Sequence, residues 1–167
     1  MTNLAIFAAG CFWGIEEKFL SQPGVLNTEV GYIGGVTKNP NYQDVCTGNT
    51  EHAEAVRVKF DSQAISYESL LKLFYEIHDP TTLNRQGPDI GTQYRSEIFC
   101  LDEEQYLIAD TFKRNLNNDK FNGNIVTSIS MAGTFWIAEE YHQKYIRKKK
   151  IQKYKKLSKF LGIHLFL

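Results

Sequence analysis

The sequence of 167 residues contains only three cysteines, and no two of them form a Cys-x-x-Cys pair. Neither these cysteines nor the four histidines show a spacing suited to zinc, so we expect no bound metal. An odd cysteine count outside a small disulfide-rich frame indicates free thiols in a reducing compartment. We therefore expect a cytoplasmic protein.

Long apolar runs are also missing. No stretch approaches the roughly 18 apolar residues that span a bilayer, and we expect no membrane partner. The segment Phe7-Ala8-Ala9-Gly10-Cys11 resembles a bacterial lipoprotein cleavage site, but only ten residues precede the cysteine. A signal peptide has about 15–30 residues and a cationic leader, which is lacking here. Because repeats and Pro- or Ser-rich linkers are absent, we predict one main domain around one core.

Carboxylates are absent from residues 144–167, which carry nine of the 19 cations. The preceding residues therefore hold 10 cations against 19 anions. Apolar residues of the tail recur at spacings of three and four, typical of an amphipathic helix: Ile151, Tyr154, Leu157 and Leu161. We divide the chain into an α+β domain, 1–147, and a basic helical tail, 148–167, packed on it or extending from it. We favour a solvated helix whose cationic face meets the acidic body, with nucleic acid or an anionic surface as the alternative partner.

Strand and helix patterns alternate along the chain. We expect strands near 3–9, 25–33, 55–60, 96–101 and 125–131, and helices over 13–21, after a Ser66 cap, over 102–117 after an Asp102 cap, and from near Glu139. Some connections are too short for parallel crossovers. We predict an α+β two-layer sandwich, a mixed β-sheet with packed helices and a ferredoxin-like core. Two loops, 36–50 and 79–94, are long for such a domain, and loops of this length are commonly functional.

The segment Gly10-Cys11-Phe12-Trp13-Gly14 lies between an apolar strand and a helix. Unpaired backbone N–H groups and the positive end of the helix dipole favour a thiolate at such a junction. We therefore expect the pKa of Cys11 to fall from about 8.5 into the range of roughly 3.5–7.5. Phe12 and Trp13 add an apolar wall beside the sulfur. The segment predicts a nucleophile for a small, partly apolar substrate.

Polar residues that could meet Cys11 come from the two long loops. Glu54 stands at the head of a strand after the first loop, where apolar neighbours favour a raised pKa and general-acid chemistry. The second loop offers Asp89, Gln93 and Tyr94. Spacing alone does not establish that these loops converge. A thiol hydrolase and a non-enzymatic methionine- or peptide-binding module stay open as alternatives at this point.

Motifs over roughly residues 4–146 resemble those of the peptide methionine sulfoxide reductase A family. They are, in order, Gly10-Cys11-Phe12-Trp13-Gly14, Gly31-Tyr32-Ile33-Gly34-Gly35, Tyr42, Cys46-Thr47-Gly48, His52-Ala53-Glu54-Ala55-Val56, Gly91-Thr92-Gln93-Tyr94-Arg95-Ser96 and Ala138-Glu139-Glu140-Tyr141-His142. The resemblance implies an α+β sandwich and thiol-dependent reduction of methionine S-sulfoxide, peptide-bound and free, to methionine.

The resemblance also implies roles for individual residues. Cys11 would attack the sulfoxide sulfur and become a sulfenic acid. Glu54 would act as the general acid, and Tyr42 and Tyr94 would donate hydrogen bonds to the sulfoxide oxygen. Substrate binding would fall to Phe12 and Trp13, which hold the S-methyl group, and to Asp89, which lines the site. We interpret His52 and His142 as structural.

The sequence departs from many relatives in its C-terminal region, because residues 101–167 contain no resolving cysteine. We expect no bound cofactor and direct reduction of the sulfenic acid by an external thiol: thioredoxin, glutaredoxin or glutathione. Resolution by Cys46 or Cys100 is the alternative. Expected partners are oxidised proteins, peptides and free methionine sulfoxide, together with the thiol donor; we expect a monomer and do not favour nucleic acid.

Overall fold

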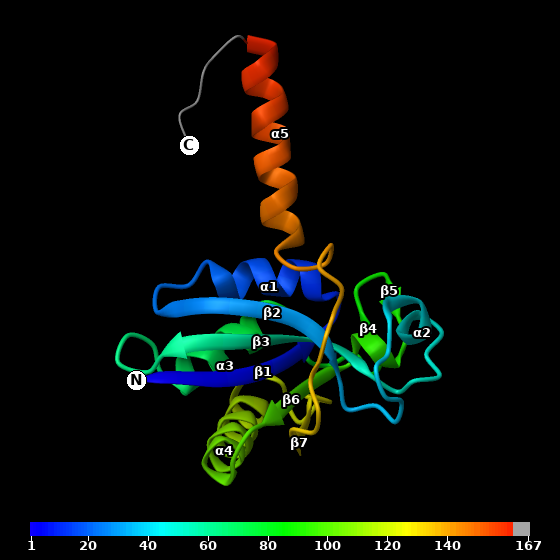
Figure 1. Ribbon diagram of the computed structural model, residues 1–167. Coiled ribbons are helices and arrows are strands. Elements are labelled where there is room, and N and C mark those ends of the chain that lie inside the picture. Colours follow the sequence, from blue (N-terminus) through cyan, green and yellow to red (C-terminus); the bar gives the residue numbers. More distant parts are fainter. Residues whose placement is uncertain (162–167) are drawn as a thin grey trace.

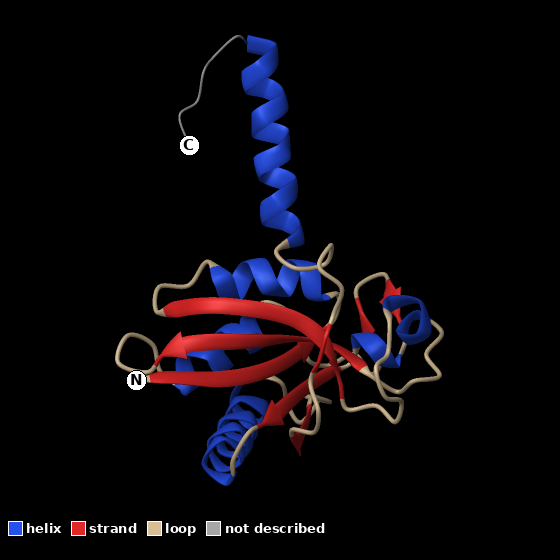
Figure 2. Cartoon of the chain, viewed as in Figure 1, coloured by secondary structure: helices blue, strands red, loops and turns tan. Residues whose placement is uncertain are grey.

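The computed structural model describes residues 1–161 (Figures 1 and 2). The end of the expected tail, 162–167, lies outside the described residues. In chain order the elements are β1 (Thr2–Ala9), α1 (Phe12–Leu20), β2 (Val25–Ile33), α2 (Tyr42–Cys46), β3 (Ala53–Asp61), α3 (Tyr67–Glu76), β4 (Arg85–Gln86), β5 (Asp89–Ile90), a 3-10 turn (Thr92–Tyr94), β6 (Ser96–Cys100), α4 (Glu103–Lys120), β7 (Ser128–Met131), β8 (Trp136–Ile137) and α5 (Tyr145–Leu161).

The main sheet has the strand order β7-β6-β1-β3-β2-β8. Its pairs are antiparallel except β6 with β7, so the sheet is mixed as expected. The four inner strands β6-β1-β3-β2, with α1 after β1 and α3 after β3, reproduce the predicted ferredoxin-like arrangement. The α+β fold class is confirmed.

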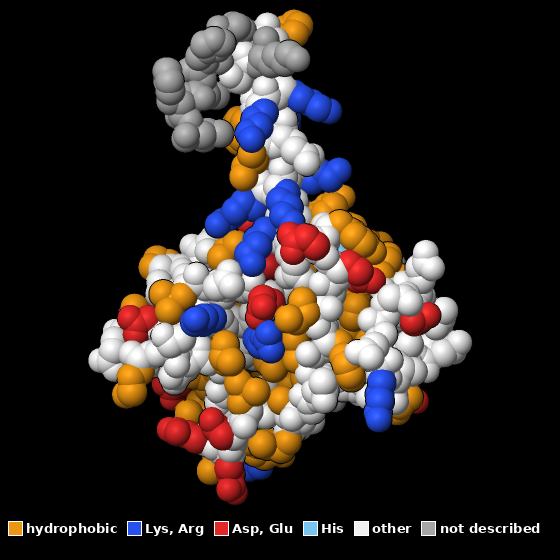
Figure 3. Space-filling model, viewed as in Figure 1, with side chains coloured by type: hydrophobic (Ala, Val, Ile, Leu, Met, Phe, Trp, Pro, Cys, Tyr) orange, Lys and Arg blue, Asp and Glu red, His pale blue; other side chains and the backbone are white. Residues whose placement is uncertain are grey.

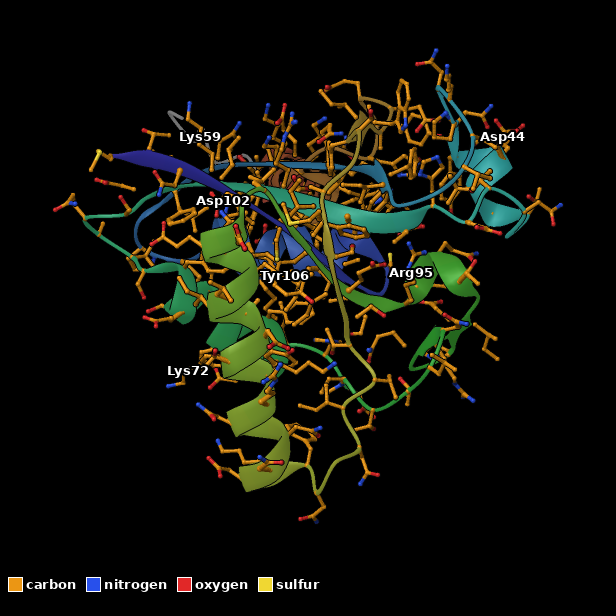
Figure 4. The ribbon with its side chains drawn as sticks, turned by 90° about the horizontal axis from the view of Figure 1, so that it is seen from below. Asp44, Lys59, Lys72, Arg95, Asp102 and Tyr106 are labelled. Carbon is orange, nitrogen blue, oxygen red and sulfur yellow. The ribbon has the colours of Figure 1, made fainter. Side chains whose placement is uncertain are left out.

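Alternation along β1 divides the core into two faces. Phe7 points toward the helices, with its ring centroid 5.0 Å from that of Phe19 on α1 and 5.4 Å from that of Phe74 on α3. Ile6 points the other way, into a smaller cluster against which Phe135 packs. Helix α4 lies beside α3 on the helical side, as Figure 4 shows. One sheet face thus carries the helices, giving the two-layer sandwich.

The predicted helix caps are formed. The Ser66 hydroxyl accepts a hydrogen bond from the backbone N–H of Ser69 (3.1 Å), and the Asp102 carboxylate accepts one from Gln105 (2.8 Å). Each bond satisfies an N–H group that has no partner within the helix. These side chains therefore define where α3 and α4 begin.

The expected helix near Glu139 is wrong, because α5 begins at Tyr145. Lys144 adopts a left-handed φ of 51°, and its N–H donates to the Glu16 carboxylate at 2.7 Å. Residues 138–144 are irregular instead. The two long loops also contain the short elements α2, β4 and β5, which are too short to show a hydrophobic period.

Candidate active site

Cys11 is the N-cap residue of α1, directly after β1. The backbone N–H groups of Trp13 and Gly14 lie close enough to favour the charged form of its thiol, although the side chain makes no capping hydrogen bond. Gly10 has a φ of +93°, and a Cβ at this position would lie 2.7 Å from the Cβ of Gln86. The missing side chain therefore lets the β4–β5 hairpin close against the strand-to-helix junction.

The pKa of Cys11 is raised to about 11, so the expected lowering is wrong. Burial is the largest cause, and the carboxyl groups of Glu54 and Asp89 add to it. The N–H groups of Trp13 and Gly14 act in the expected direction but do not outweigh burial and negative charge. At neutral pH the free protein therefore holds Cys11 as a thiol.

Glu54 lies at the head of β3, opposite Tyr32 of β2, and is only 2% exposed. Its Oε2 accepts a hydrogen bond from the backbone N–H of Phe12 at 3.1 Å, which fixes the carboxyl group beside Cys11. Burial raises the pKa of Glu54 to about 7; the Phe12 bond opposes this shift and Asp89 supports it. The raised pKa predicted from the sequence is thus present, and Glu54 carries a proton for much of the time near neutral pH.

Tyr42 and Tyr94 come from the two long loops and meet at this site. Burial, followed by the charge of Glu54, raises the pKa of Tyr94 to about 12, and Cys11 lies close enough to contribute. Burial and the adjacent Cys46 side chain raise the pKa of Tyr42 well above its usual range. Both hydroxyls therefore keep their protons at neutral pH and can donate hydrogen bonds. Cys46 lies against the Tyr42 hydroxyl at the exposed rim.

Glu139 holds two parts of the site together. One carboxylate oxygen accepts from the backbone N–H of Tyr42 (2.8 Å), and the other accepts from the Tyr32 hydroxyl (2.8 Å). Burial acts to raise the pKa of Glu139, but these hydrogen bonds outweigh it and lower the pKa overall. The anionic form is therefore the one that ties α2 to β2.

His142 supports the aromatic wall of the site. Its Nδ1 accepts a hydrogen bond from the Trp13 indole N–H at 2.9 Å, which places the ring proton on Nε2. Its ring also contacts those of Phe12 and Tyr42, with centroids 5.2 and 4.6 Å away. Burial lowers the pKa of His142, although Glu139 opposes this shift. A neutral, buried imidazole therefore orients Trp13.

The geometry places all seven sequence-predicted site residues around one junction. The family model described as "Peptide methionine sulfoxide reductase" matches residues 3–166. The chain belongs to the peptide methionine sulfoxide reductase family.

Individual relatives show how far this similarity extends. A peptide methionine sulfoxide reductase MsrA of Methanoculleus marisnigri is 56% identical over 146 residues, covering 87% of this chain and 89% of that protein. The reduced form of Mxr1 from Saccharomyces cerevisiae superposes with a TM-score of 0.85 at 35% identity, over 89% of this chain and 86% of that one. The complex of Mxr1 with Trx2 gives a TM-score of 0.63 at 25% identity, over 86% of this chain and 84% of the other.

The protein is therefore an enzyme that reduces methionine sulfoxide. The described residues contain no group of three or more His, Cys, Asp or Glu side chains that could hold a metal ion. The sequence indicated a structural role for His142, which its hydrogen bond with Trp13 bears out, but it assigned no role in this reductase to Glu139. Both residues belong to the motif Ala138-Glu139-Glu140-Tyr141-His142, which the sequence analysis had singled out. Nothing within this motif indicates which distant groups the two side chains contact.

Replacing His142 with phenylalanine tests how the reductase orients Trp13. The variant keeps a buried ring but leaves the indole N–H without its acceptor, an expected cost of about 1 kcal/mol and hence a rise in KM of about fivefold to tenfold. If Trp13 holds the S-methyl group, as the resemblance implies, kcat should change little, because that contact would be the same before and during the reaction. Steady-state kinetics with dithiothreitol as reductant measures both constants. An unchanged KM with a reduced kcat would contradict this role.

Proposed function

We propose that Cys11 is the nucleophile and Glu54 the general acid in the reduction of methionine S-sulfoxide, both peptide-bound and free. The observation that carries the proposal is the hydrogen bond from the Phe12 N–H to Glu54, which holds a carboxyl group with a pKa of about 7 beside the cysteine. A sulfoxide sulfur becomes electrophilic enough for attack when its oxygen is protonated. A buried carboxylic acid next to a thiol supplies that combination.

The proposed reaction conserves atoms and electrons. Cys11 reacts as the thiolate, having lost its proton to the Glu54 carboxylate or to solvent. Its Sγ forms a bond to the sulfoxide sulfur while the proton on Glu54 moves to the sulfoxide oxygen, whose double bond to sulfur becomes a single bond. The resulting hydroxyl group is then transferred to Cys11, and the bond between the two sulfurs breaks. Methionine leaves with two more electrons than the sulfoxide had, and Cys11 is oxidised to a sulfenic acid.

The substrate is oriented by the side chains around this pair. Tyr42 and Tyr94 are protonated hydroxyl donors suited to the sulfoxide oxygen. Phe12 and Trp13 offer aromatic surfaces to the S-methyl group, because sulfur and its methyl group pack favourably on rings. Asp89 lies close enough to raise the pKa values of both Cys11 and Glu54, and we assign it to the site lining.

We further propose that an external thiol reduces the sulfenic acid. Thioredoxin is the leading candidate, ahead of glutaredoxin and glutathione. One thiol displaces the hydroxyl as water and forms a mixed disulfide; a second thiol releases Cys11. The solved complex of the similar Mxr1 with Trx2 supports a thioredoxin donor. Cys100 is fully buried within β6, which argues against it as a resolving group. Free thiols at all three cysteines also fit the cytoplasmic monomer expected from the sequence.

The test of recycling is a pair of single variants, Cys46→Ser and Cys100→Ser. If an external thiol attacks the sulfenic acid directly, both variants should turn over with thioredoxin, thioredoxin reductase and NADPH at the wild-type rate. Cys46 is the more demanding case, because it is exposed and lies beside Tyr42. Loss of thioredoxin-driven turnover in either variant, with one stoichiometric reduction retained, would show that the cysteine resolves the sulfenic acid.

The proposed function is tested with the two epimers of N-acetylmethionine sulfoxide and with the free amino acid. With dithiothreitol present, we expect consumption of the S epimer of each and none of the R epimer. Mass spectrometry after one turnover without reductant should find one added oxygen on the peptide that contains Cys11. Equal consumption of both epimers, or oxygen on another residue, would refute the assignment.

A further inference from the structure

The base of α5 is fixed to the catalytic body. The Tyr145 ring stacks on Trp13 with centroids 3.9 Å apart. Glu17 of α1 forms ion pairs with Lys150 at 2.9 Å and with Arg147 at 3.5 Å. Cationic residues of the first turns of α5 therefore meet an acidic residue of the body.

Beyond these contacts α5 projects away from the body, as Figure 1 shows. Its apolar residues remain in solvent: Ile151 is 44% exposed, Tyr154 65% and Leu157 51%. They recur every three residues, so they form one stripe along the helix. The described protein thus presents an apolar helix face that its own core does not cover.

Lysines surround this stripe on the same helix: the helical period places Lys153 and Lys155 on its two sides and Lys156 opposite it. Lys153, Lys155 and Lys156 are exposed, and within residues 1–161 no carboxylate pairs with them. Figure 3 shows Lys and Arg side chains along α5, with acidic side chains gathered on the body below. Positive charge is thus concentrated on the one element that leaves an acidic body.

We propose that α5 binds an anionic phospholipid surface, with its apolar stripe in the interface and its lysines among the headgroups. A cationic polar face opposite an apolar face, with low overall hydrophobicity, is the pattern of helices that lie in a membrane interface. Binding would be peripheral, because no helix in the described part of the chain is long and apolar enough to cross a bilayer. Since α5 begins against Trp13, the bound helix would bring the catalytic site to the lipid surface.

Two other occupants fit the helix less well. A second copy of α5, packed stripe to stripe, would bring together the lysines that border the stripe on each helix, which like charges oppose. Nucleic acid would account for the lysines but leave the apolar stripe exposed. The proposal departs from the expectation of no membrane partner, because the sequence could not show that the helix stands clear of the body.

The experiment measures flotation of the full chain with vesicles of phosphatidylcholine alone or with phosphatidylglycerol. One variant carries Ile151→Gln, Tyr154→Gln and Leu157→Gln and tests the apolar stripe; a second carries Lys153→Gln, Lys155→Gln and Lys156→Gln and tests the positive charge. Both triple variants retain helix-forming residues, and circular dichroism verifies the helix. We expect wild type to bind the anionic vesicles only, and both variants to lose that binding at least about tenfold. Activity on free methionine sulfoxide should be unchanged.

Several results would overturn the proposal. One is that the wild-type protein fails to bind anionic vesicles at low salt. Another is the apolar variant binding them as tightly as wild type, which would reduce the interaction to surface charge. Duplex DNA binding that the apolar variant retains, without vesicle binding, would identify a nucleic-acid element instead. Self-association in analytical ultracentrifugation that depends on the apolar stripe would identify a second copy as the occupant.

Discussion

Cys11→Ser is expected to leave no detectable reduction of methionine S-sulfoxide, either in turnover or in a single stoichiometric reaction. A serine hydroxyl is a far weaker nucleophile than a thiol and cannot form the sulfenic acid that stores the removed oxygen. The substitution is close to isosteric, and Cys11 caps α1 without a side-chain hydrogen bond, so the fold should persist. The measurement is methionine released per enzyme molecule, with and without dithiothreitol.

The matched control for Cys11 is Cys46→Ser, which removes an exposed thiol at the same site. We expect this variant, like wild type, to release one methionine per enzyme without reductant. If Cys11→Ser also released one equivalent, the nucleophile would have to be another residue and the proposed function would fail.

Glu54→Gln is expected to slow methionine release in a single turnover by about 10²–10⁴-fold, the usual contribution of a positioned acid. Glutamine keeps an oxygen to accept the Phe12 N–H but has no proton to give to the sulfoxide oxygen. The control is Glu29→Gln, a partly exposed carboxylate on β2 that pairs with Arg57 and should react as wild type. A rate within the range of the control would contradict the assignment of Glu54.

The Glu54→Gln variant should also change the pKa of Cys11. The charge of Glu54 helps to raise the pKa of Cys11 to about 11, so a neutral glutamine is expected to lower that pKa. Thiolate absorbance in the ultraviolet, titrated in the Cys46→Ser background, measures this shift. No shift would mean that the two groups do not interact electrostatically, contrary to the geometry.

The dependence on pH follows from counting protons on the pair. The reacting arrangement, a Cys11 thiolate beside a Glu54 carboxylic acid, carries one proton. The pair holds one proton between the Glu54 pKa of about 7 and the Cys11 pKa of about 11, and two protons below about 7. We therefore expect the single-turnover kcat/KM to rise about tenfold per pH unit below pH 7 and to be level above it.

Glu54→Gln removes the lower of these two titrations. The rate constant of this variant, although much smaller, should keep rising above pH 7, because only the thiolate fraction of Cys11 then changes with pH. Rapid-quench measurements across this range separate the two profiles. A wild-type rate constant that falls between neutral and alkaline pH would show that Glu54 must bring its own proton while Cys11 reacts as the thiol.

The sequence by itself determined the elements whose pattern is local. The apolar run of β1, the helical pattern of α1, and the caps Ser66 and Asp102 of α3 and α4 depend on neighbours within a few residues. The sequence also indicated Cys11, because it lies between a strand and a helix, and Glu54, because it lies at the start of a strand. The family resemblance indicated the same two residues. Local interactions suffice there, because backbone geometry and capping involve short stretches of chain.

Only the tertiary structure decided the electrostatics and the supports of the site. The pKa of the Cys11 thiol is raised rather than lowered. Burial and the two carboxyl groups from other elements raise it by more than the N–H groups at the start of α1 lower it. The Glu139 carboxylate accepts hydrogen bonds from Tyr32 and Tyr42, and it lies within residues 138–144, which form no helix although one was expected. Burial and charge depend on groups that are far apart in the chain. Their combined effect on the pKa of Cys11 is therefore set only when the loops close around this residue.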